Sequence, residues 1–552
     1  MVNEFAAILA KIAVGVFFLT LLVSGVFIGG TALHDPDTCW LLALGRWIFE
    51  NHGLPSIEPF SYTFAQLGRP LVLYQWLSEA IFYGSYSLAG LIGLLLLVTV
   101  SVVVSFIVLP MKLFAHTKSS WTAALGAMFV GLVAASFHFL ARPEILSYVL
   151  LSSFLFLLAK HRFSLMQEPE AASRVDWKFI GCVGAVMLLW VNCHTGFTSL
   201  VVVLCVYLFA DSLARAVLRQ HSPLDLSSVV SLLVATVVTL CNPYGFGLWS
   251  YIPSLFFAKF NYLIDELHAV DFRRPEFIPF LVFMAICVAI LRRRWCHALA
   301  AKVPIEKIQL IDSIAVMTVC AVEAWTHLRL IPFVVLICLG ELSLLLASGS
   351  ADSDSGNKLL ALFDQKLAEG LAPPVKLGTT GCALFAFAIG VCGTLLTVFS
   401  IQAPRLPQSG VAFVAPFNAV ETIGGKSIEG NILNDAQFGD LLIWYHPGAP
   451  LVFIDTRYDM YGEALVNDYL TLVQAKPGWQ ELMKKYDIKT VFLRPHNALV
   501  EKLKQEPDWH VDFSDDKAVV ISQPVPKKPE SSGTKTSFNN EVTNRSAYFS
   551  LQ

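Results

Sequence analysis

The chain has 552 residues, of which 55% are hydrophobic and 15% are charged, and its mean hydropathy is +0.61. A soluble domain carries about 25% charged residues, so this composition excludes an ordinary soluble protein and indicates an integral membrane protein. The formal net charge of −3 and the lack of a basic stripe argue against a polyanion-binding protein, and we expect no nucleic acid partner.

Eleven segments are apolar enough to cross a bilayer, given that a span needs about 20 residues. The predicted spans lie near 5–32, 80–109, 121–140, 143–160, 179–192, 196–212, 226–241, 277–291, 308–325, 330–347 and 378–402. The fold class that we predict is an α-helical polytopic membrane protein, with a transmembrane domain over 1–402. The first segment is long for a signal peptide and no small-residue cleavage site follows it, so we expect an uncleaved helix.

Positive charge predicts the orientation of these spans, because Lys and Arg collect on the cytoplasmic side. With a cytoplasmic N-terminus, the five inner loops hold 16 Lys and Arg in 88 residues, whereas the five outer loops hold 7 in 96. An odd number of spans then places residues 403–552 on the non-cytoplasmic side.

The first outer loop, residues 33–79, contains a helix that is too short to span. After Asp37, an apolar stretch with Trp40 and Trp47 continues to Gly53. The pattern predicts a helix that begins at an Asp or Thr cap, ends at this glycine and lies along the membrane surface.

The pattern changes after the last predicted span. Residues 403–428 contain prolines and are predicted to form a linker. From 429 to 523, short apolar strands alternate with amphipathic helices, which predicts a small α/β domain. Strands are expected at 452–455, 490–493 and 518–521, and helices at 435–445, 463–475, 477–486 and 498–505. The tail, 524–552, is rich in Ser, Lys and Asn and is expected to be disordered.

Polar side chains are costly in so apolar a protein, and here they collect at the outer ends of the predicted spans. The clusters lie at 34–37, 142–144, 192–194, 242–244, 265–274 and 327–329. Because they share one side of the membrane in this topology, we expect them to surround one cavity on the non-cytoplasmic side.

Asp35-Pro36-Asp37 is the sharpest of these clusters. Pro36 favours an extended conformation for Asp35, and residues two apart in an extended segment point to the same face. The two carboxylates can therefore converge on a metal ion or on a substrate hydroxyl, with one of them acting as a general base. In the alternative interpretation, which the spacing alone favours, Asp37 caps the following helix and Asp35 is a solvated loop residue.

Other polar residues at the outer ends are candidates for substrate binding. Arg142 and Arg329 have the planar, permanently charged group that clamps a phosphate. His194 is a candidate for binding phosphate, a metal or a proton, although a single histidine is more often a hydrogen-bonded structural residue. Glu144 and Asp271 are the further acidic candidates.

Two polar motifs have simpler structural interpretations. Asn242-Pro243-Tyr244 is most simply a turn after a helix. The triplet 455–457, Asp-Thr-Arg at the end of an expected strand, is interpreted as a structural turn or a domain contact.

Several motifs follow one another in a fixed order along nearly the whole chain. They are HDPDTCW at 34–40, GRWI at 45–48, GLP at 53–55, EPFSYT at 58–63, QWL at 75–77, ARP at 141–143, WVNCHTGF at 190–197, NPYG at 242–245, HLRLIPF at 327–333, FGDLLIW at 438–444, VFIDTR at 452–457 and DMYG at 459–462. In these motifs the chain resembles a bacterial family of GT-C-like membrane glycosyltransferases. It departs from the family where a second Trp and a His would follow Trp40, with Gln75 where Glu is usual and with Glu58 where Asp is usual.

The resemblance implies an inverting enzyme that moves a sugar from a polyprenyl-phosphate donor to a glycan, lipid or protein acceptor on the non-cytoplasmic face. It also implies a multi-pass protein of the bacterial inner (plasma) membrane that functions in the cell envelope. The acidic motif after the first helix would act as catalytic base or metal ligand, which favours Asp35 and Asp37 and suggests Mg²⁺ or Mn²⁺ as a cofactor.

Other functions remain open at this point. A transporter or lipid flippase would place ionisable groups near the membrane midplane, often in repeated halves. Here the charges lie at one end of the spans and no repeat is visible. A polysaccharide polymerase or ligase would lack the acidic motif, and a non-catalytic protein of the same fold would keep only the binding function.

Overall fold

The structure, a computed structural model, describes residues 32–347 except 69, 221–222, 272 and 301–303, scattered positions between 362 and 391, and residues 414–425 and 430–524. The predicted span at 5–32 lies outside the described residues except for residue 32. The one at 378–402 does so almost entirely, and so does the tail beyond residue 524.

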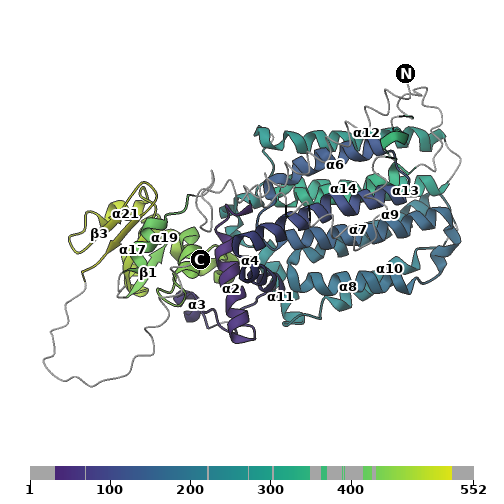
Figure 1. The fold of residues 1–552 in the computed structure, drawn as a ribbon. Helices are drawn as coiled ribbons and strands as arrows, with labels where there is room; N and C mark the ends of the chain where they lie inside the picture. Colours follow the sequence, from purple (N-terminus) through teal and green to yellow (C-terminus); the bar gives the residue numbers. More distant parts are fainter. Residues whose placement is uncertain are drawn as a thin grey trace.

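Long apolar helices form a bundle at one end of the molecule (Figure 1). Seven of the described helical segments are long and apolar enough to cross a membrane: Trp76–His116, Trp121–His138, Glu144–Gln167, Thr195–Val217, Pro275–Ala298, Glu306–Thr326 and Leu328–Leu345. Two shorter apolar helices, α8 (Trp177–Cys193) and α10 (Leu226–Val238), pack against each other. Together they coincide with the nine predicted spans between 80 and 347, so the polytopic helical class is confirmed.

The elements within these segments follow one another with short connections. They are α4 (Trp76–Val103), a π-helical turn η1 (Val104–Val108), α5 (Leu109–His116), α6 (Trp121–Ala135), α7 (Glu144–Gln167), α9 (Thr198–Val217), α12 (Ile278–Ala300), α13 (Pro304–Thr326) and α14 (Ile331–Leu345). Between α10 and α12, the chain forms α11 (Phe246–Phe256) and the short turns η5 (Lys259–Leu263), η6 (Asp265–Leu267) and η7 (Pro275–Phe277).

Helix α2 (Asp37–Asn51) lies between the bundle and the C-terminal domain (Figure 1). It packs against α4 on one side and α18 (Ala436–Tyr445) on the other. Gly45 permits the close approach to α4, because a β-carbon there would overlap the backbone oxygen of Glu79. The helix was predicted in the right place, but its first half is buried by protein on both sides instead of facing lipid.

The C-terminal domain contains a four-stranded sheet in the order β1-β2-β4-β3. Strand β1 (Asn431–Asn434) is parallel to β2 (Ile488–Leu493), whereas β4 (Val519–Ser522) is antiparallel to both β2 and β3 (His510–Ser514). Its helices are α17 (Phe417–Gly424), α18, α19 (Tyr458–Val473), α20 (Trp479–Lys485) and α21 (Ala498–Leu503).

Two local predictions for this region are corrected by the structure. The apolar run 452–455 is not a strand of the sheet, because Val452 forms an isolated bridge with Ser61 of the first outer loop. Within the predicted linker, 403–428, residues of α17 form a helix that packs against α18 and the β3–β4 hairpin. Ala419, Val420 and Ile423 are buried there, so this helix belongs to the packed domain.

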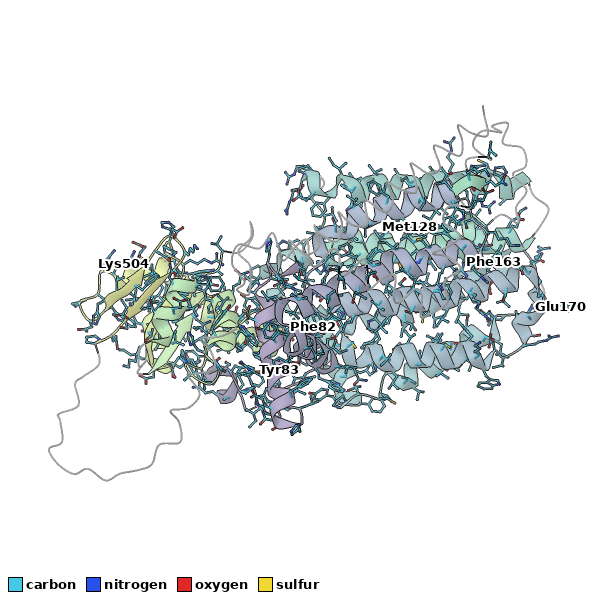
Figure 2. All side chains as sticks on the ribbon, viewed as in Figure 1. Phe82, Tyr83, Met128, Phe163, Glu170 and Lys504 are labelled. Carbon is cyan, nitrogen blue, oxygen red and sulfur yellow. The ribbon has the colours of Figure 1, made fainter. Side chains whose placement is uncertain are left out.

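The first outer loop packs against the C-terminal domain and connects it to the bundle. Its short helix α3 (Tyr62–Gln66) contributes to a second hydrophobic core that also contains Trp40 of α2 and the interior of the C-terminal domain. The Tyr62 hydroxyl donates to the carbonyl of Ile432, 3.1 Å away. Glu170 and Lys504 mark the opposite ends of the molecule in Figure 2, with the first outer loop between them.

Candidate functional site

Polar residues from four of the predicted clusters, 34–37, 142–144, 192–194 and 327–329, and Glu266 of a fifth come together in two neighbouring groups at the start of α2 and of α7. The connection before α7, the turn η6 and the segment before α19 reach the same place. Ion pairs and hydrogen bonds link residues that are more than 100 positions apart in the sequence.

Arg142 is the centre of this acidic cluster. Its Nε contacts the carboxylate of Asp35, its Nη2 lies 3.1 Å from Asp37 Oδ2, and its Nη1 lies 2.9 and 2.8 Å from the two oxygens of Glu266. A guanidinium has five N–H donors in a fixed fork, and each of its three nitrogens here has a carboxylate partner. Arg142 therefore orders the three acids instead of presenting an open fork to a ligand.

Asp35 and Asp37 have different surroundings. The side chain of Asp35 is only 3% exposed, and its Oδ1 accepts the backbone N–H of Asp37 at 3.0 Å. The side chain of Asp37 is 20% exposed. Asp37 is the first residue of α2. The N-cap position before it is occupied by Pro36, whose side chain makes no capping hydrogen bond. The interpretation of Asp37 as the helix cap is therefore wrong, because Asp35 takes that role and leaves the Asp37 carboxylate available.

The C-terminal domain supplies the other partner of Asp37. The Thr456 hydroxyl lies 2.7 Å from Asp37 Oδ1 and 3.0 Å from Asp440 Oδ2. One hydroxyl has one proton, so it can donate to Asp37 only if Asp440 donates to it. Burial, with Asp37 and Asp455 nearby, raises the pKa of Asp440 well above its usual value. Protonation of Asp440 would complete a hydrogen-bond chain that ends at Asp37.

Burial also raises the pKa of Asp37, to about 7. Asp35 and Glu266 add to the increase, whereas Arg142 and the Thr456 hydroxyl oppose it. Burial alone would raise the pKa of Glu266 as well, but Arg142 and His138 hold it below its usual value. A carboxylate whose pKa lies near the working pH is suited to accept a proton in a reaction.

Glu144, His194 and Arg329 form a neighbouring group. Arg329 contacts Glu144 at the start of α7, and His194 Nε2 lies 3.5 Å from the same carboxylate. The other ring nitrogen of His194 accepts the Gly196 N–H at 3.1 Å and lies 2.9 Å from Ser147 Oγ. These contacts match the interpretation of His194 as a hydrogen-bonded structural residue.

Asp271 lies apart from these two groups. Its side chain is 39% exposed, and its carboxylate accepts the Arg273 guanidinium at 2.8 and 2.9 Å. Residues 242–244 form the predicted turn, in which Asn242 Oδ1 accepts the Tyr244 N–H at 2.8 Å.

Sequence reasoning did not assign a role to several residues of the cluster. His138 Nε2 lies 3.3 Å from Glu266, and its other ring nitrogen lies 3.0 Å from the Tyr148 hydroxyl. His138 stands alone in an apolar stretch, and no motif marks it. Glu266 was one of three acids in its polar cluster at 265–274, and Asp440 was noted only within a motif.

The triplet 455–457 is confirmed as a domain contact. Arg457 forms two 3.0 Å hydrogen bonds with Glu58 of the first outer loop. Asp455 accepts the same guanidinium at 2.9 and 2.6 Å, and it also accepts the Tyr461 hydroxyl. This buried network fixes the position of Thr456 beside Asp37.

The donors in the cluster do not match a metal site. In the described part of the chain, no three His, Cys, Asp or Glu side chains are placed to hold a metal ion. Asp35 and Asp37, the two predicted ligands, both contact the guanidinium of Arg142 instead. Both carboxylates are thus already paired with a cation in this structure.

Comparisons with known proteins give similarity at the level of structure. No protein-family model matches the chain, and no curated protein matches its sequence. ArnT from Cupriavidus metallidurans in the apo state is 14% identical, with a TM-score of 0.47 over 93% of this chain and 98% of that one. The same protein bound to undecaprenyl phosphate is 14% identical, with a TM-score of 0.46 over 92% and 97%. The archaeal oligosaccharyltransferase AglB from Archaeoglobus fulgidus, in complex with an inhibitory peptide and a dolichol-phosphate, is 11% identical, with a TM-score of 0.45 over 86% and 69%.

Proposed function

We propose that this chain is an inverting membrane glycosyltransferase that moves a sugar from a polyprenyl-phosphate donor to a glycan, lipid or protein acceptor on the non-cytoplasmic face. The observation that carries the proposal is the environment of Asp37. Its carboxylate is partly exposed, its pKa is raised to about 7, and it is held between Arg142 of the bundle and Thr456 of the C-terminal domain. The surrounding motif is also the one in which the sequence resembles GT-C-like glycosyltransferases.

In the proposed reaction, Asp37 removes the proton from an acceptor hydroxyl. The acceptor oxygen attacks the anomeric carbon of the donor from the side opposite the lipid phosphate. The bond between that carbon and the phosphate oxygen breaks, its electron pair leaves with the phosphate, and the anomeric configuration inverts. A positioned general base contributes about 10²–10⁴-fold to such a step.

We assign the stabilisation of the departing phosphate to Arg329 in preference to Arg142. The Arg329 side chain is 30% exposed, and its carboxylate partner in the described residues is Glu144. Arg142 is 18% exposed and already contacts three carboxylates. A guanidinium that is permanently charged and partly open can stabilise the charge that develops on a leaving phosphate.

The other groups support the base. Asp35 holds the start of α2 and Arg142 balances the charge of the acids, so that Asp37 stays in a fixed position. The C-terminal domain contributes Thr456 and encloses the site from the outside. Because Arg142 already neutralises the acidic pair, the proposed reaction contains no step through Mg²⁺ or Mn²⁺.

The test is a transfer assay with the purified full-length chain in proteoliposomes. A panel of radiolabelled undecaprenyl-phosphate sugars is supplied together with extracted envelope glycans, lipids and proteins as acceptors. We expect one donor to lose its sugar to an acceptor and to release undecaprenyl phosphate. Movement of intact lipid-linked sugar across the bilayer without such release would instead support the transporter alternative.

A further inference from the structure

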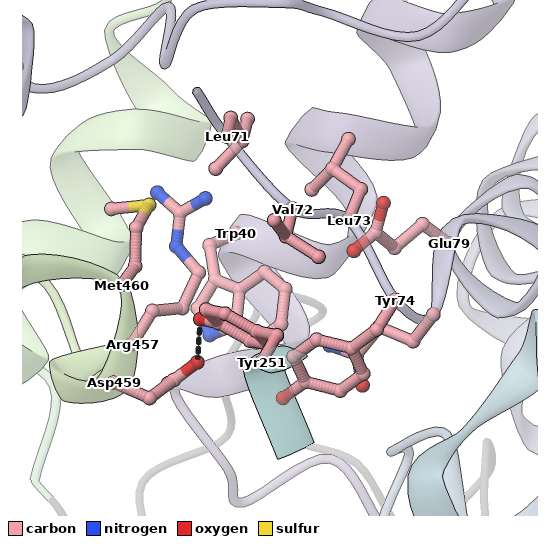
Figure 3. A pocket seen from close by; sticks show the side chains of 11 residues that line it. Trp40, Leu71, Val72, Leu73, Tyr74, Glu79, Tyr251, Arg457, Asp459 and Met460 are labelled. Carbon is pink, nitrogen blue, oxygen red and sulfur yellow. Dashed lines mark hydrogen bonds between the residues drawn. The ribbon is translucent and has the colours of Figure 1, made fainter. Parts of the chain in front are cut away.

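Three arginines form ion pairs with the acids of this region, and they differ in the hydrogen-bond donors that remain. Arg142 contacts three carboxylates. Arg457 makes four hydrogen bonds to buried carboxylates and lies over the ring of Trp40 (Figure 3). Among the described residues, Arg329 forms its ion pair with Glu144 alone, and its side chain is 30% exposed. Arg329 therefore keeps N–H groups with which it can bind a phosphate.

The contact with Glu144 holds the Arg329 side chain in place. Arg329 lies on η8 (Leu328–Leu330), a short 3-10 turn between α13 and α14. An arginine side chain loses much rotamer entropy when a ligand fixes it, so an arginine that is already held binds an anion more tightly. Glu144 is suited to hold it, because it begins α7, where the helix dipole favours a negative charge.

His194 lies beside this carboxylate, and its hydrogen bonds fix which ring nitrogen carries the proton. Nδ1 accepts the Gly196 N–H at 3.1 Å. Ser147 Oγ lies 2.9 Å from the same nitrogen and accepts the Trp190 indole N–H at 2.8 Å, which leaves its own hydrogen for Nδ1. A ring nitrogen that accepts carries no hydrogen, so the proton of the neutral ring lies on Nε2.

The Nε2 side of the His194 ring faces the carboxylate that holds Arg329. Nε2 lies 3.5 Å from Glu144 Oε1, and both side chains are buried. In such surroundings the attraction between an N–H group and a carboxylate is stronger than it is in water. The three side chains thus form a line of contacts, with the ring at the buried end and the partly exposed guanidinium at the other.

The position of the ring is tightly constrained by Gly196. A β-carbon at Gly196 would lie 3.0 Å from His194 Nδ1 and 2.9 Å from Ser147 Oγ, so any other residue would displace one of them. His194 and Gly196 belong to the WVNCHTGF motif, Arg329 belongs to HLRLIPF, and Glu144 directly follows ARP. Three motifs from distant parts of the chain therefore meet in one line of contacts.

We infer that His194 is a positioning residue that acts through Glu144 on Arg329. The ring holds the carboxylate, the carboxylate holds the guanidinium, and the guanidinium receives the phosphate of the lipid-linked donor. The identity of that phosphate rests on the proposed function. His194 itself does not touch the substrate.

The experiment separates the roles of the two nitrogens of His194. His194→Asn keeps an acceptor near Nδ1 for the Gly196 N–H but is too short to reach Glu144. His194→Gln extends an amide N–H to the position of Nε2 and keeps that contact. His510→Asn is the matched control, because His510 is exposed on β3. Binding of undecaprenyl phosphate to each full-length protein in detergent micelles is measured by microscale thermophoresis, and thermal unfolding is recorded in parallel.

We expect His194→Asn to bind undecaprenyl phosphate about 2- to 10-fold more weakly than the wild type, the range for one net hydrogen bond. His194→Gln and the control should bind like the wild type. A purely structural role predicts the reverse order, because the Gly196 contact is the one that asparagine keeps. In an Arg329→Ala background, His194→Asn should cause no further loss, since residues that act through one contact are not additive. This comparison carries the test if His194→Gln does not fold.

The inference is overturned if the wild type does not bind undecaprenyl phosphate, if His194→Asn binds as well as the wild type, or if folded His194→Gln binds no better than His194→Asn. Additive losses in the double variant with Arg329→Ala overturn it as well. Sugar transfer by the wild type is assayed alongside. Transfer with additive losses would refute the positioning role and leave the proposed function standing. The expected binding losses without transfer from any donor would refute the proposed function and leave Arg329 as a positioned phosphate site.

Discussion

Replacing Asp37 by Asn separates the chemistry of this residue from its structural surroundings. Asn keeps the shape of the side chain and an oxygen that can accept from the Thr456 hydroxyl. The backbone N–H at the start of α2 is held by Asp35 and is not affected by the substitution. Arg142 retains its contacts with Asp35 and Glu266. What Asp37→Asn removes is the charge and the basicity.

The expected loss of activity is large, and no loss of stability is expected. Without its general base the transfer step should slow by about 10²–10⁴-fold, or about 3–5 kcal/mol of activation free energy. The pKa of Asp37 is raised from 3.8 to about 7. Ionised Asp37 therefore disfavours the folded state by about 4 kcal/mol above pH 7, and this penalty disappears as the pH falls towards 3.8. Asn carries no such penalty, so the variant should unfold at the same or a higher temperature.

The assay is the turnover of a lipid-linked donor, with Asp516→Asn as a matched control on the exposed surface of the C-terminal domain. In the wild type, log kcat/KM should rise with a slope of one up to about pH 7 and then level off, because only the ionised carboxylate accepts a proton. Turnover by Asp37→Asn at more than a tenth of the wild-type rate, or a flat profile through pH 7, would refute the reasoning.

Four further outcomes follow from the structure. Asp35→Asn should shift the acid limb of the pH profile to lower pH, because the charge of Asp35 raises the pKa of Asp37; an unchanged limb would contradict this coupling. Arg329→Ala should weaken the binding of undecaprenyl phosphate by about 1.5–3 kcal/mol, whereas the exposed Arg273→Ala should not, and equal affinities would assign Arg329 to structure. Chelation with EDTA should leave the transfer rate unchanged. If EDTA lowers the transfer rate and added Mg²⁺ or Mn²⁺ restores it, the acids do bind a metal. The free energy of unfolding in urea should be higher for the fragment 414–523 than for the same fragment without α17, by about 3–6 kcal/mol for two buried aliphatic side chains; equal free energies would make the helix a linker.

Much of the bundle could be predicted from the sequence, because crossing a bilayer is a local requirement. A helix in lipid must satisfy its own backbone and present about 20 apolar residues. Each span between 80 and 347 can therefore be recognised from its own residues. The same holds for β2 and β4, whose short apolar runs lie where strands were expected.

Predictions that depend on distant neighbours failed or stayed open. The run 452–455 is as apolar as a strand, but its backbone pairs with the first outer loop, almost 400 positions away. Pattern alone also suggested Asp37 as the helix cap, whereas the geometry at Pro36 gives that role to Asp35.

The sequence by itself determined the membrane class, the series of spans between 80 and 347 and the position of an acidic motif before α2, since each depends on residues that are close in the chain. Only the tertiary structure decided that Arg142 pairs with both Asp35 and Asp37, and that Thr456 reaches Asp37 across 419 positions. The charge, burial and hydrogen bonding of a side chain depend on what packs against it, and that is settled only when the distant segments meet.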